Sequence, residues 1–554
     1  MRNGKDLIRN IPENRKKDIE KYLSFKGEDI GNLKFLEAAY LEEIDGFDYK
    51  FFKLSPKEAS LMDPNQRKFL ETAWTAIEDG GYGGNKLKGT KTGVFVGFSN
   101  NPLNNYVDII SDVEPGELPI SLSGNLTSII PSRISYLLDL KGPSMLIDTA
   151  CSSSLTAVHT ACRSLKSGEC DIAIAGGVKI NIMPLDNEIK IGIESSTGRT
   201  RAFDDDSDGT GIGEGVISFL LKPLKRAIED KDNIYAIIKG SAVNQDGTSV
   251  GITAPNVKAQ TEVILEAWRD SKIDPATLSY IEAHGTGTEL GDPLEIEGLN
   301  EAFRKHTKKR NFCAISTVKS NIGHLYEASG MAGLLKAVLS LKHKELAPSI
   351  HFVKPNDKID FIDTAVYVND RLTKWDVNNT ARRCGISSFG FSGTNCHVVL
   401  EEAPEIKYES VAHDSSAEII GLTAKSEAAL YELVRRYKTF LQNSEGICLK
   451  DICSTANTGR THHNFRLAVV AKDKKELLYK LDFILENKFS GLDRAIGFYG
   501  KHFVIMIDKE ILQQGELRQK EKLELTTQVG LLTEELAEQD IFDNSLLERY
   551  VSYM

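Results

Sequence analysis

Residues 144–154, SMLIDTACSSS, place a cysteine where a predicted strand gives way to a predicted helix. Residues 145–147 are an apolar run typical of a strand, and residues 148–150 form a tight turn. In residues 155–166 apolar side chains recur at steps of three and four, which predicts a helix with one buried face. Cys151 therefore lies at a helix N-terminus, where unpaired N–H groups and the helix dipole favour a thiolate.

The local pattern leaves two interpretations of Cys151 open. A helix N-terminus stabilises a thiolate by about 0.3–1 kcal/mol, or about 2 kcal/mol with partial burial. Since one pKa unit is about 1.4 kcal/mol, this effect alone lowers the pKa of the thiol by about one unit and favours a nucleophile. The other interpretation is a buried structural cysteine, because free cysteines are among the most buried residues.

The composition is that of a globular protein with several domains. The chain has 554 residues, which predicts about two to four domains. The net charge of -11 argues against a nucleic-acid surface, although it allows a local basic patch. We expect no membrane span and no signal peptide. The eight cysteines contain no C-x-x-C pair, so neither a zinc site nor a disulfide framework is indicated, and we expect a cytoplasmic protein.

Strands and helices alternate over the first 400 residues, which predicts a layered α/β architecture. Strands are predicted at residues 92–97, 171–177, 216–221, 234–239, 279–283, 312–317 and 397–400. Helices are predicted at residues 62–81, 259–270 and 329–343. Residues 385–395, GISSFGFSGTN, are glycine-rich, and no strand is assigned to them.

Two histidines follow strands in the same way as the cysteine does. His284 comes directly after the strand at 279–283, and the loop after the strand at 312–317 carries Lys319, Asn321 and His324. Because sites assemble at the C-terminal ends of strands in α/β sheets, these junctions together favour the nucleophile over the structural cysteine. Either histidine alone could still be a satisfied core residue.

One cysteine with two histidines indicates a particular kind of chemistry. A cysteine protease needs one histidine and an orienting amide or acid. With two histidines, a thiolate could hold an acyl group while the imidazoles stabilise negative charge on a second substrate that loses CO₂.

Two further motifs are rejected as binding sites. Residues 209–215, GTGIGEG, lack the G-x-G-x-x-G spacing and precede a strand, so no dinucleotide is expected. Asp204, Asp206 and Asp208 match the first half of a calcium loop, but its twelfth position is Gly215. We therefore interpret these residues as a solvated Asp-rich turn and predict no metal site.

The last 150 residues have a different character. Residues 403–510 predict a small α/β domain, with a helix capped by Ser426 and a strand at 466–471. Residues 511–554 are charged and predicted to be helical. A regular apolar stripe runs along them: Leu525, Val529, Leu532 and Leu536. This stripe could be packed core or could face a partner.

Four motifs carry a specific resemblance. DTACSSSL, EAHGTGTELGDPLE, VKSNIGH and SSFGFSGTN, in this order, resemble the β-ketoacyl synthase (ketosynthase) domains of modular type I polyketide synthases. The resemblance extends over residues 3–404, and residues 405–510 resemble the linker domain that follows such ketosynthases. Neither an acyltransferase G-x-S-x-G elbow nor a carrier-protein serine motif follows. The chain therefore resembles trans-acyltransferase assembly lines, in which a separate acyltransferase loads malonyl groups.

This resemblance implies the architecture. It predicts a thiolase fold over residues 1–402, with two similar halves at about 1–230 and 231–402 arranged in five layers. A linker domain at 403–510 and a helical tail at 511–554 complete the chain. The implied partners are a second copy in a homodimer, acyl carrier proteins, the trans-acting acyltransferase, and other synthase subunits that could bind the tail.

The resemblance also implies the reaction, a decarboxylative Claisen condensation. Cys151 would take an acyl chain from an upstream carrier protein, and His284 and His324 would assist decarboxylation of malonyl-carrier. Lys319 would orient the histidines, and the backbone N–H groups of Cys151 and Phe391 would form an oxyanion hole. The resemblance implies no bound cofactor, because the substrates are attached to the phosphopantetheine of carrier proteins. Further predicted site residues are Asn321 in support and Thr286, Thr288, Phe389, Gly390 and Asn395 at the substrate.

The sequence departs from the family in two places. Ketosynthases begin with a strand of the type IAIIG, and the sequence lacks this strand. We therefore expect a gap at the centre of the first sheet, where neighbouring backbone groups would be unpaired. A misplaced start, an element from another chain or a damaged domain would each explain it. After His324 the family usually reads Leu-Glu-Ala-Ala, whereas Leu325 is followed by Tyr326 and Glu327. This predicts a bulky ring and a displaced carboxylate near the second histidine.

Two alternatives to a chain-elongating ketosynthase stay open. A non-elongating relay ketosynthase commonly lacks the histidine of the HGTGT motif, and the presence of His284 argues against it. A non-catalytic scaffold that assembles through the stripe at 525–536 is favoured by the short N-terminus and opposed by the complete Cys-His-His set.

Overall fold

The computed structural model describes residues 1–100, 105–186, 192–377, 380–405, 418–444, 446–487 and 505–506. The chain divides into two compact units, Met1–Ala76 with Lys88–Glu405 and Ile77–Leu87 with Ile406–Met554. The predicted tail at 511–554 and its apolar stripe lie outside the described residues. Within the described residues, no helix is both long and apolar enough to span a membrane.

The first unit contains two sheets with a repeated strand order. The first sheet consists of β3 (Ser144–Ile147), β2 (Thr92–Gly97), β4 (Ile172–Lys179) and β6 (Gly215–Leu221). The second consists of β11 (Val366–Val368), β9 (Cys313–Ser316), β8 (Tyr280–Glu282), β13 (Arg383–Phe389), β14 (Thr394–Glu402) and β7 (Ala236–Gln245). The run β3-β2-β4-β6 matches β9-β8-β13-β14, and the last strand is antiparallel in both. This repeat confirms the predicted fold class, an architecture of two similar halves.

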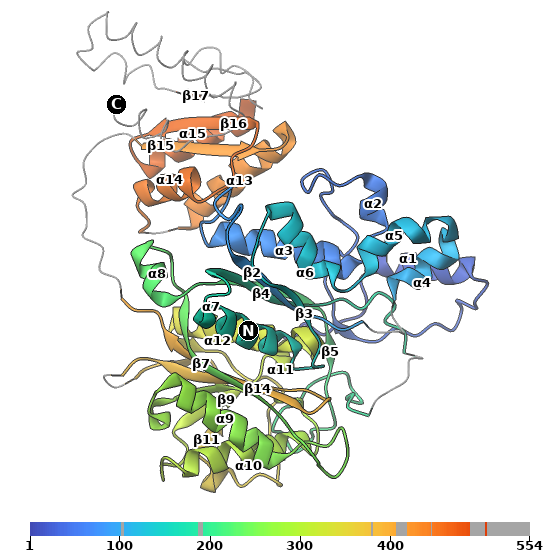
Figure 1. Ribbon diagram of the computed structural model, residues 1–554, viewed down its shortest axis with the longest axis vertical. Helices are drawn as coiled ribbons and strands as arrows, with labels where there is room; N and C mark the ends of the chain where they lie inside the picture. Colours follow the sequence, from blue (N-terminus) through green and yellow to red (C-terminus); the bar gives the residue numbers. More distant parts are fainter. Residues whose placement is uncertain are drawn as a thin grey trace, which may run out of the picture. The chain divides into compact units, whose positions relative to one another are not determined.

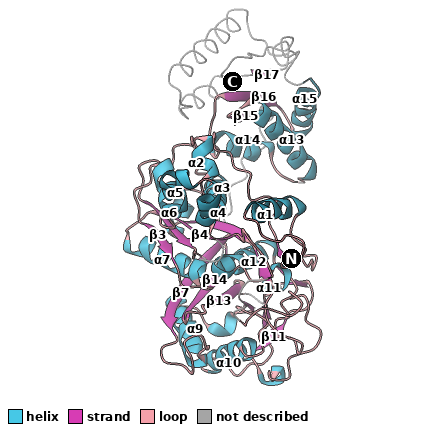
Figure 2. Cartoon of the chain, turned by 90° about the vertical axis from the view of Figure 1, so that its right-hand side faces the viewer, coloured by secondary structure: helices cyan, strands magenta, loops and turns pink. Residues whose placement is uncertain are grey.

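Helices complete five layers around these sheets (Figure 1, Figure 2). In the middle layer, α7 (Ser153–Ser167) and α12 (Ser329–His343) lie between the two sheets. The outer layers contain α3 (Pro64–Asp79) and α6 (Ile129–Leu138) on the first sheet, and α9 (Val257–Ser271) and α10 (Gly291–Arg304) on the second. A Cβ at Gly330 would lie 2.7 Å from the Cβ of Leu155, so the two central helices pack in direct contact.

The remaining elements of the first unit are short or peripheral. Its other helices are α1 (Glu13–Phe25), α2 (Pro56–Ser60), α4 (Tyr106–Val113), η1 (Pro115–Glu117), α5 (Leu118–Asn125), α8 (Leu224–Glu229), η2 (Pro275–Thr277), α11 (Lys319–Ile322), η3 (Tyr326–Ala328) and η4 (Phe361–Asp363). Its other strands are β1 (Ala38–Ala39), β5 (Ile212–Gly213), β10 (Glu345–Leu346) and β12 (Thr373–Lys374).

The structure corrects two predictions about strands. The glycine-rich stretch at 385–395, which has no assigned strand in the prediction, contains β13 in its first half, and β13 pairs with β8 and β14. A Cβ at Gly385 would lie 2.7 Å from the imidazole of His397, so this glycine serves close packing inside the sheet. The expected gap at the centre of the first sheet is also wrong, because β2 pairs directly with β4 from Thr92 to Gly97.

The second unit is the predicted small α/β domain. Its sheet has the order β15 (Glu418–Ala424), β16 (Phe465–Ala471) and β17 (Ile505–Met506). The helices are α13 (Glu427–Asn443), α14 (Leu449–Thr458) and α15 (Lys474–Asn487). The hydroxyl of Ser426 accepts a hydrogen bond from Ala429 N at 3.2 Å, which confirms the predicted N-cap of α13.

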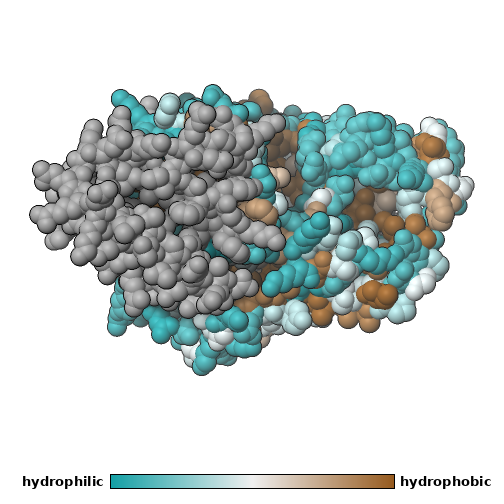
Figure 3. Space-filling view, turned by 90° about the horizontal axis from the view of Figure 1, so that it is seen from above, coloured by the Kyte–Doolittle hydropathy of each residue, from teal (hydrophilic) through white to brown (hydrophobic). Residues whose placement is uncertain are grey.

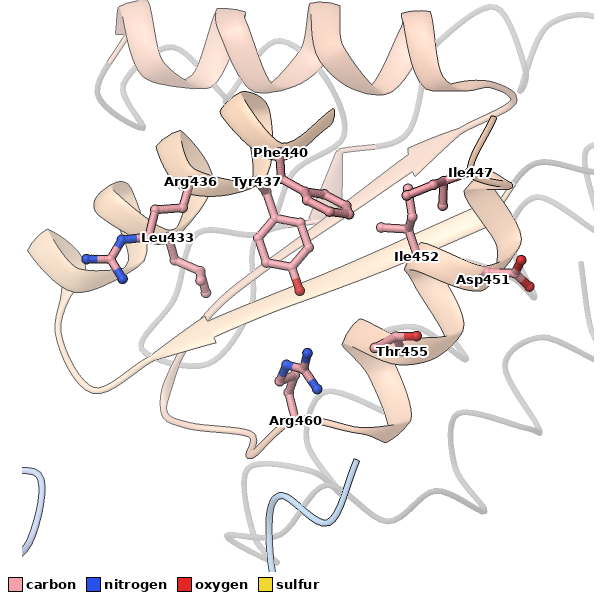
Figure 4. A pocket seen from close by; sticks show the side chains of 9 residues that line it. All are labelled: Leu433, Arg436, Tyr437, Phe440, Ile447, Asp451, Ile452, Thr455 and Arg460. Atoms are coloured by element: carbon pink, nitrogen blue, oxygen red, sulfur yellow. The ribbon is translucent and has the colours of Figure 1, made fainter. Parts of the chain in front are cut away.

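A pocket of about 390 Å³ lies between α13 and α14 of this unit (Figure 4). The rings of Tyr437 and Phe440 face Ile447 and Ile452 across it, and Arg460 lies at its base. The other lining residues are Leu433, Arg436, Asp451 and Thr455. The lining contains neither cysteine nor histidine, so this pocket is separate from the reactive residues predicted above.

Candidate active site

Cys151 lies in a strained turn between β3 and α7. The residue before it, Ala150, has a φ of +53°, in the left-handed region that residues with a side chain rarely adopt. The hydroxyl of Ser388 in β13 donates to the carbonyl of Cys151 at 2.9 Å. Cys151 is 6% exposed, and α7 begins two residues later. The Ser388 hydrogen bond therefore ties this turn of the first half to β13 of the second half.

The segment of Gly390 and Phe391 closely approaches the turn that carries Cys151. The backbone N–H groups of Phe391 and of Cys151 itself act to lower the pKa of the thiol, and this is the pair predicted as an oxyanion hole. Gly390 allows this approach, because a Cβ there would lie 2.4 Å from Thr149 O and 2.9 Å from Ser152 Oγ. A substrate carbonyl bonded to this sulfur would find the same two donors within reach.

The pKa of the thiol differs in direction from the prediction. Burial raises the pKa of Cys151 to about 11, the N–H of Phe391 opposes this rise, and the Glu327 carboxylate adds to it. The predicted lowering by the helix N-terminus is therefore wrong in its net sign. A dipole effect of about one unit is smaller than the cost of placing a thiolate among buried groups.

The loop after β8 holds His284 through its backbone. Glu295 in α10 accepts hydrogen bonds from the N–H groups of His284 and Gly285, each at 2.8 Å. The ammonium of Lys319 donates to His284 O at 2.5 Å. The ring nitrogen Nδ1 of His284 is buried without a partner. Lys319 thus holds the backbone carbonyl of His284, and its role in orienting the histidines stays a prediction.

The loop after β9 holds His324 through its ring. His324 Nδ1 accepts a hydrogen bond from Tyr326 N at 3.0 Å and lies 2.6 Å from Ser329 Oγ. Because an amide can only donate, Nδ1 carries no proton, and the neutral ring has its proton on Nε2. Nε2 is buried without a partner, so this N–H is available to a substrate oxygen.

The two imidazoles lie side by side. Their ring centroids are 5.7 Å apart at an interplanar angle of 85°, and Phe389 lies 5.7 Å from His284 on another side. Burial lowers the pKa of both histidines well below the usual value, and the ammonium of Lys319 adds to the effect. Both rings are therefore neutral near pH 7 and act as hydrogen-bonding groups rather than as cations.

The glycine-rich stretch at 209–215 joins the two histidine loops. Gly209 N donates to Gly287 O at 2.8 Å, and His324 N donates to Gly211 O at 2.7 Å. A Cβ at Gly213 would lie 2.0 Å from Ile322 O, so the backbone approach here requires glycine. The glycines thus serve the packing of the site.

The Asp-rich turn is not fully solvated, which corrects the prediction for Asp204. Asp204 is buried and accepts hydrogen bonds from Val353 N at 2.6 Å and Lys354 N at 2.9 Å, while Asp206 and Asp208 are exposed. In the described part of the chain, no three His, Cys, Asp or Glu side chains are grouped to hold a metal ion.

Four other predicted site residues make contacts within the protein. Thr286 and Thr288 hydroxyls lie 3.2 Å apart, and Thr288 accepts from Gly291 N at the start of α10. The Asn395 amide donates to Asp246 at 2.7 Å, which ties β14 to the end of β7. The Asn321 amide donates to Lys5 O at 3.0 Å. Their roles at a substrate stay predictions.

Two buried acids of the site were not predicted. Glu295 supports His284, and Asp292 accepts from Gly287 N at 3.0 Å and from Phe203 N at 2.6 Å. Burial raises the pKa of both carboxyls to about 7. A signal for them exists, because Asp292 and Glu295 share the buried face of α10 with Ile296 and Leu299.

Two similar halves with the same run of strands, which carry Cys151 in the first half and two neutral imidazoles in the second, place the protein in the thiolase-fold class. Comparison of the sequence with models of known protein families supports this class. Sequence models described as "Beta-ketoacyl synthase, N-terminal domain" and "Beta-ketoacyl synthase, C-terminal domain" match residues 1–227 and 235–353. A third, "CurL-like, PKS C-terminal", matches residues 418–481.

Solved structures give the same result. A ketosynthase from module 6 of the bacillaene synthase of Bacillus subtilis is 36% identical, with a TM-score of 0.79 over 95% of this chain and 87% of that one. The oxazolomycin ketosynthase domain OzmH KS7 of Streptomyces albus is 34% identical, with a TM-score of 0.80 over 88% of this chain and 85% of that one. The chain therefore belongs to the ketosynthase family of polyketide synthases.

Curated relatives are much longer than this chain. Polyketide synthase PksL of Bacillus subtilis is 40% identical over 514 residues, which cover 88% of this chain and 11% of PksL. Polyketide synthase PksN of the same organism is 39% identical over 536 residues, 93% of this chain and 10% of PksN. The chain spans about a tenth of the length of these relatives.

Proposed function

We propose that the protein catalyses decarboxylative Claisen condensation between an acyl group on Cys151 and a malonyl group on an acyl carrier protein. The observation that carries this proposal is the fixed tautomer of His324, a neutral imidazole that presents a buried Nε2–H next to His284. A neutral donor stabilises a developing enolate oxygen without removing a proton from the substrate.

The reaction divides into two half-reactions. In the first, the Cys151 sulfur attacks the thioester of an upstream acyl-carrier, the carrier thiolate leaves, and the thiol proton passes to that thiolate. In the second, the malonyl carboxylate carbon leaves as CO₂, and its bonding pair forms an enolate next to His284 and His324. The enolate carbon attacks the acyl carbonyl, whose oxygen is held by the Cys151 and Phe391 N–H groups, and Cys151 is released as a thiolate that takes a proton from water.

The high pKa of Cys151 fits this sequence of steps. A neutral thiol rests among buried groups, and ionisation is needed only during acyl transfer. Lys319 carries a positive charge near the sulfur, which supports transient thiolate formation.

We assign residues 1–402 to the ketosynthase domain, 403–510 to its linker domain, and 511–554 to a tail that binds other synthase subunits. The substrates arrive on the phosphopantetheine of carrier proteins, and a trans-acting acyltransferase supplies malonyl groups. The similarity to PksL and to bacillaene ketosynthases supports these assignments and a cytoplasmic location.

A homodimer is part of this proposal. β3 pairs only with β2 in the described residues, so its outer edge is open to a second copy. Met145 on this strand and Tyr136 on α6, which packs against β3, are 44% and 84% exposed. In Figure 3, apolar side chains gather among hydrophilic ones on the side that carries α4 and α5. The variant Tyr136→Glu with Met145→Lys should sediment as a monomer where the unaltered protein sediments as a dimer.

Intact-protein mass spectrometry tests the proposed reaction. The protein should gain one acyl group from an acyl-carrier thioester, and malonyl-carrier should then remove this mass as an extended product on the carrier. Cys151→Ala should gain no acyl group. Acylation without extension would support the relay ketosynthase instead, and the absence of acylation would support a scaffold.

A further inference from the structure

Tyr326 adopts an unusual backbone conformation directly beside His324. Its φ is +44°, in the left-handed region that bulky residues rarely adopt. Such a conformation persists only where neighbouring groups hold it, and it is typical of functional sites. Here it brings the N–H of Tyr326 within 3.0 Å of His324 Nδ1. The strained residue therefore determines which nitrogen of His324 carries the proton.

The side chain of Tyr326 contacts the same imidazole. The two rings are stacked, with centroids 5.0 Å apart and an interplanar angle of 11°. The phenol ring covers one face of the imidazole, while Tyr326 N and Ser329 Oγ engage its Nδ1. These contacts together leave His324 one orientation, in which Nε2–H stays available to a substrate.

A buried ion pair lies behind this ring. Lys179, the last residue of β4, places its ammonium 5.0 Å from the centroid of the Tyr326 ring. The same ammonium lies 3.5 Å from the Glu327 carboxylate, and the two side chains are 9% and 10% exposed. A buried ammonium is stabilised by a carboxylate and by an aromatic face. Lys179 thus connects both residues of η3 that depart from the family pattern.

We propose that Tyr326 is a positioning residue for His324 and that the Lys179–Glu327 ion pair holds the Tyr326 ring in place. This inference rests on the proposed condensation and refines its second half-reaction. With its ring held by Tyr326, His324 directs Nε2–H at the thioester oxygen of malonyl-carrier while CO₂ leaves. Tyr326 itself makes and breaks no covalent bond.

The inference predicts that the two half-reactions respond differently. Acylation of Cys151 depends on the sulfur and on the N–H groups of Cys151 and Phe391, whereas the ring of Tyr326 stacks on His324. Decarboxylation depends on the orientation of His324. A misplaced catalytic group can lower a rate by as much as about a hundredfold, so removal of the ring should slow CO₂ release by roughly tenfold to a hundredfold.

Three substitutions at Tyr326 form the test, and each leaves the backbone N–H in place. Tyr326→Phe keeps the ring, whereas Tyr326→Ala and Tyr326→Gly remove it. Glycine adopts a positive φ without strain, whereas alanine adopts it only at a cost in stability, so these two variants separate lost stability from a lost ring. Acylation is followed by intact mass, CO₂ release from malonyl-carrier by the acylated protein is followed separately, and thermal unfolding checks the fold.

We expect the Phe variant to release CO₂ within about twofold of the unaltered protein, and the Ala and Gly variants to lose a similar, larger factor with acylation unchanged. Lys179→Met should slow CO₂ release, and Lys179→Met with Glu327→Leu should recover part of the loss because no buried charge is left unpaired. Equal CO₂ release by the Ala, Gly and unaltered proteins would overturn the inference, as would a parallel loss of acylation. If the unaltered protein neither acylates nor releases CO₂, the proposed function itself fails.

Discussion

The loops that carry His284 and His324 lie side by side, yet they are held in opposite ways. The His284 loop is fixed through its backbone by Glu295 and Lys319, and its Nδ1 is left without a partner. The His324 loop is fixed through the ring itself, by Tyr326 N and Ser329 Oγ. The protein therefore sets the tautomer of His324, whereas the tautomer of His284 can change when a substrate binds.

Each loop also relies on a buried lysine and carboxylate. Lys319 and Glu295 lie behind His284, and Lys179 and Glu327 lie beside His324. Both lysines disfavour the charged form of His324, which keeps its pKa low and the ring neutral. Substitutions that unpair one member of either pair should therefore separate the two loops experimentally.

The largest expected effect is the loss of stability caused by Glu295→Ala. This change leaves the N–H groups of His284 and Gly285 without their acceptor, and it removes a buried carboxyl that interacts electrostatically with the Lys319 ammonium. Breaking a buried pair in this way costs about 3–5 kcal/mol in the free energy of unfolding, which denaturant titration measures. Glu295→Gln keeps an oxygen acceptor and should cost clearly less. Equal stability of the Ala variant and the unaltered protein would contradict the backbone-held description of the His284 loop.

The next largest effect is the pH dependence of the rate at which Cys151 is acylated. Since burial raises the pKa of Cys151 to about 11, the thiolate is the minor form at neutral pH, and the acylation rate should rise about tenfold per pH unit from neutrality upward. Glu327→Gln removes a negative charge that adds to this pKa, so acylation at a fixed pH should become faster. Lys319, the other charged group that acts on the thiol, is unchanged. Stopped-flow mass measurements between pH 7 and about pH 9 check the slope, and a rate independent of pH would contradict it.

Ser329→Ala tests how strongly the hydroxyl of Ser329 holds the ring of His324. The variant removes one of the two groups at His324 Nδ1 and leaves the amide of Tyr326 as the other. A hydrogen bond of this kind contributes about 0.5–1.5 kcal/mol, so CO₂ release should slow by roughly twofold to tenfold. Acylation serves as the internal control, and no change in CO₂ release would show that the hydroxyl is dispensable for orienting the ring.

The smallest effect is expected for a substitution in the second unit, which contains neither histidine loop. Ser426→Ala removes the N-cap of α13 in the second unit and should cost about 1 kcal/mol of stability there. Neither half-reaction involves this helix, so acylation and CO₂ release should keep their rates. Thermal unfolding measures the loss of stability, and the rates of acylation and CO₂ release are measured on the same variant. A lost rate would show that the second unit contributes to the chemistry.

The sequence is sufficient to predict much of the fold and to name the candidate reactive residues. Cys151, His284 and His324 each follow an apolar run, and α12 has the predicted bounds because its apolar face has helical spacing throughout. β13 was missed because Gly385, Ser387 and Ser388 interrupt its apolar character. This strand forms because β8 and β14 pair with it on both sides, which no local pattern records.

Electrostatic detail was the least predictable part of the site. The sign of the pKa shift of Cys151 depends on burial by elements far away in the sequence. The same holds for Lys179 and Glu327, since a strand end and a short helix from different parts of the chain bring them together. Glu295 could have been predicted, because a carboxylate on the apolar face of a helix needs a buried partner.

The central claim is that Cys151 carries the acyl group while the imidazoles act only on the second substrate. The most direct measurement follows acyl mass on His324→Ala after addition of an acyl-carrier thioester and then malonyl-carrier. We predict full acylation of Cys151 and a persistent acyl-enzyme, because loss of one oxyanion donor slows decarboxylation by about 10²–10³-fold. Extension at the rate of the unaltered protein, or failure of the variant to acylate while it remains folded, would contradict the account.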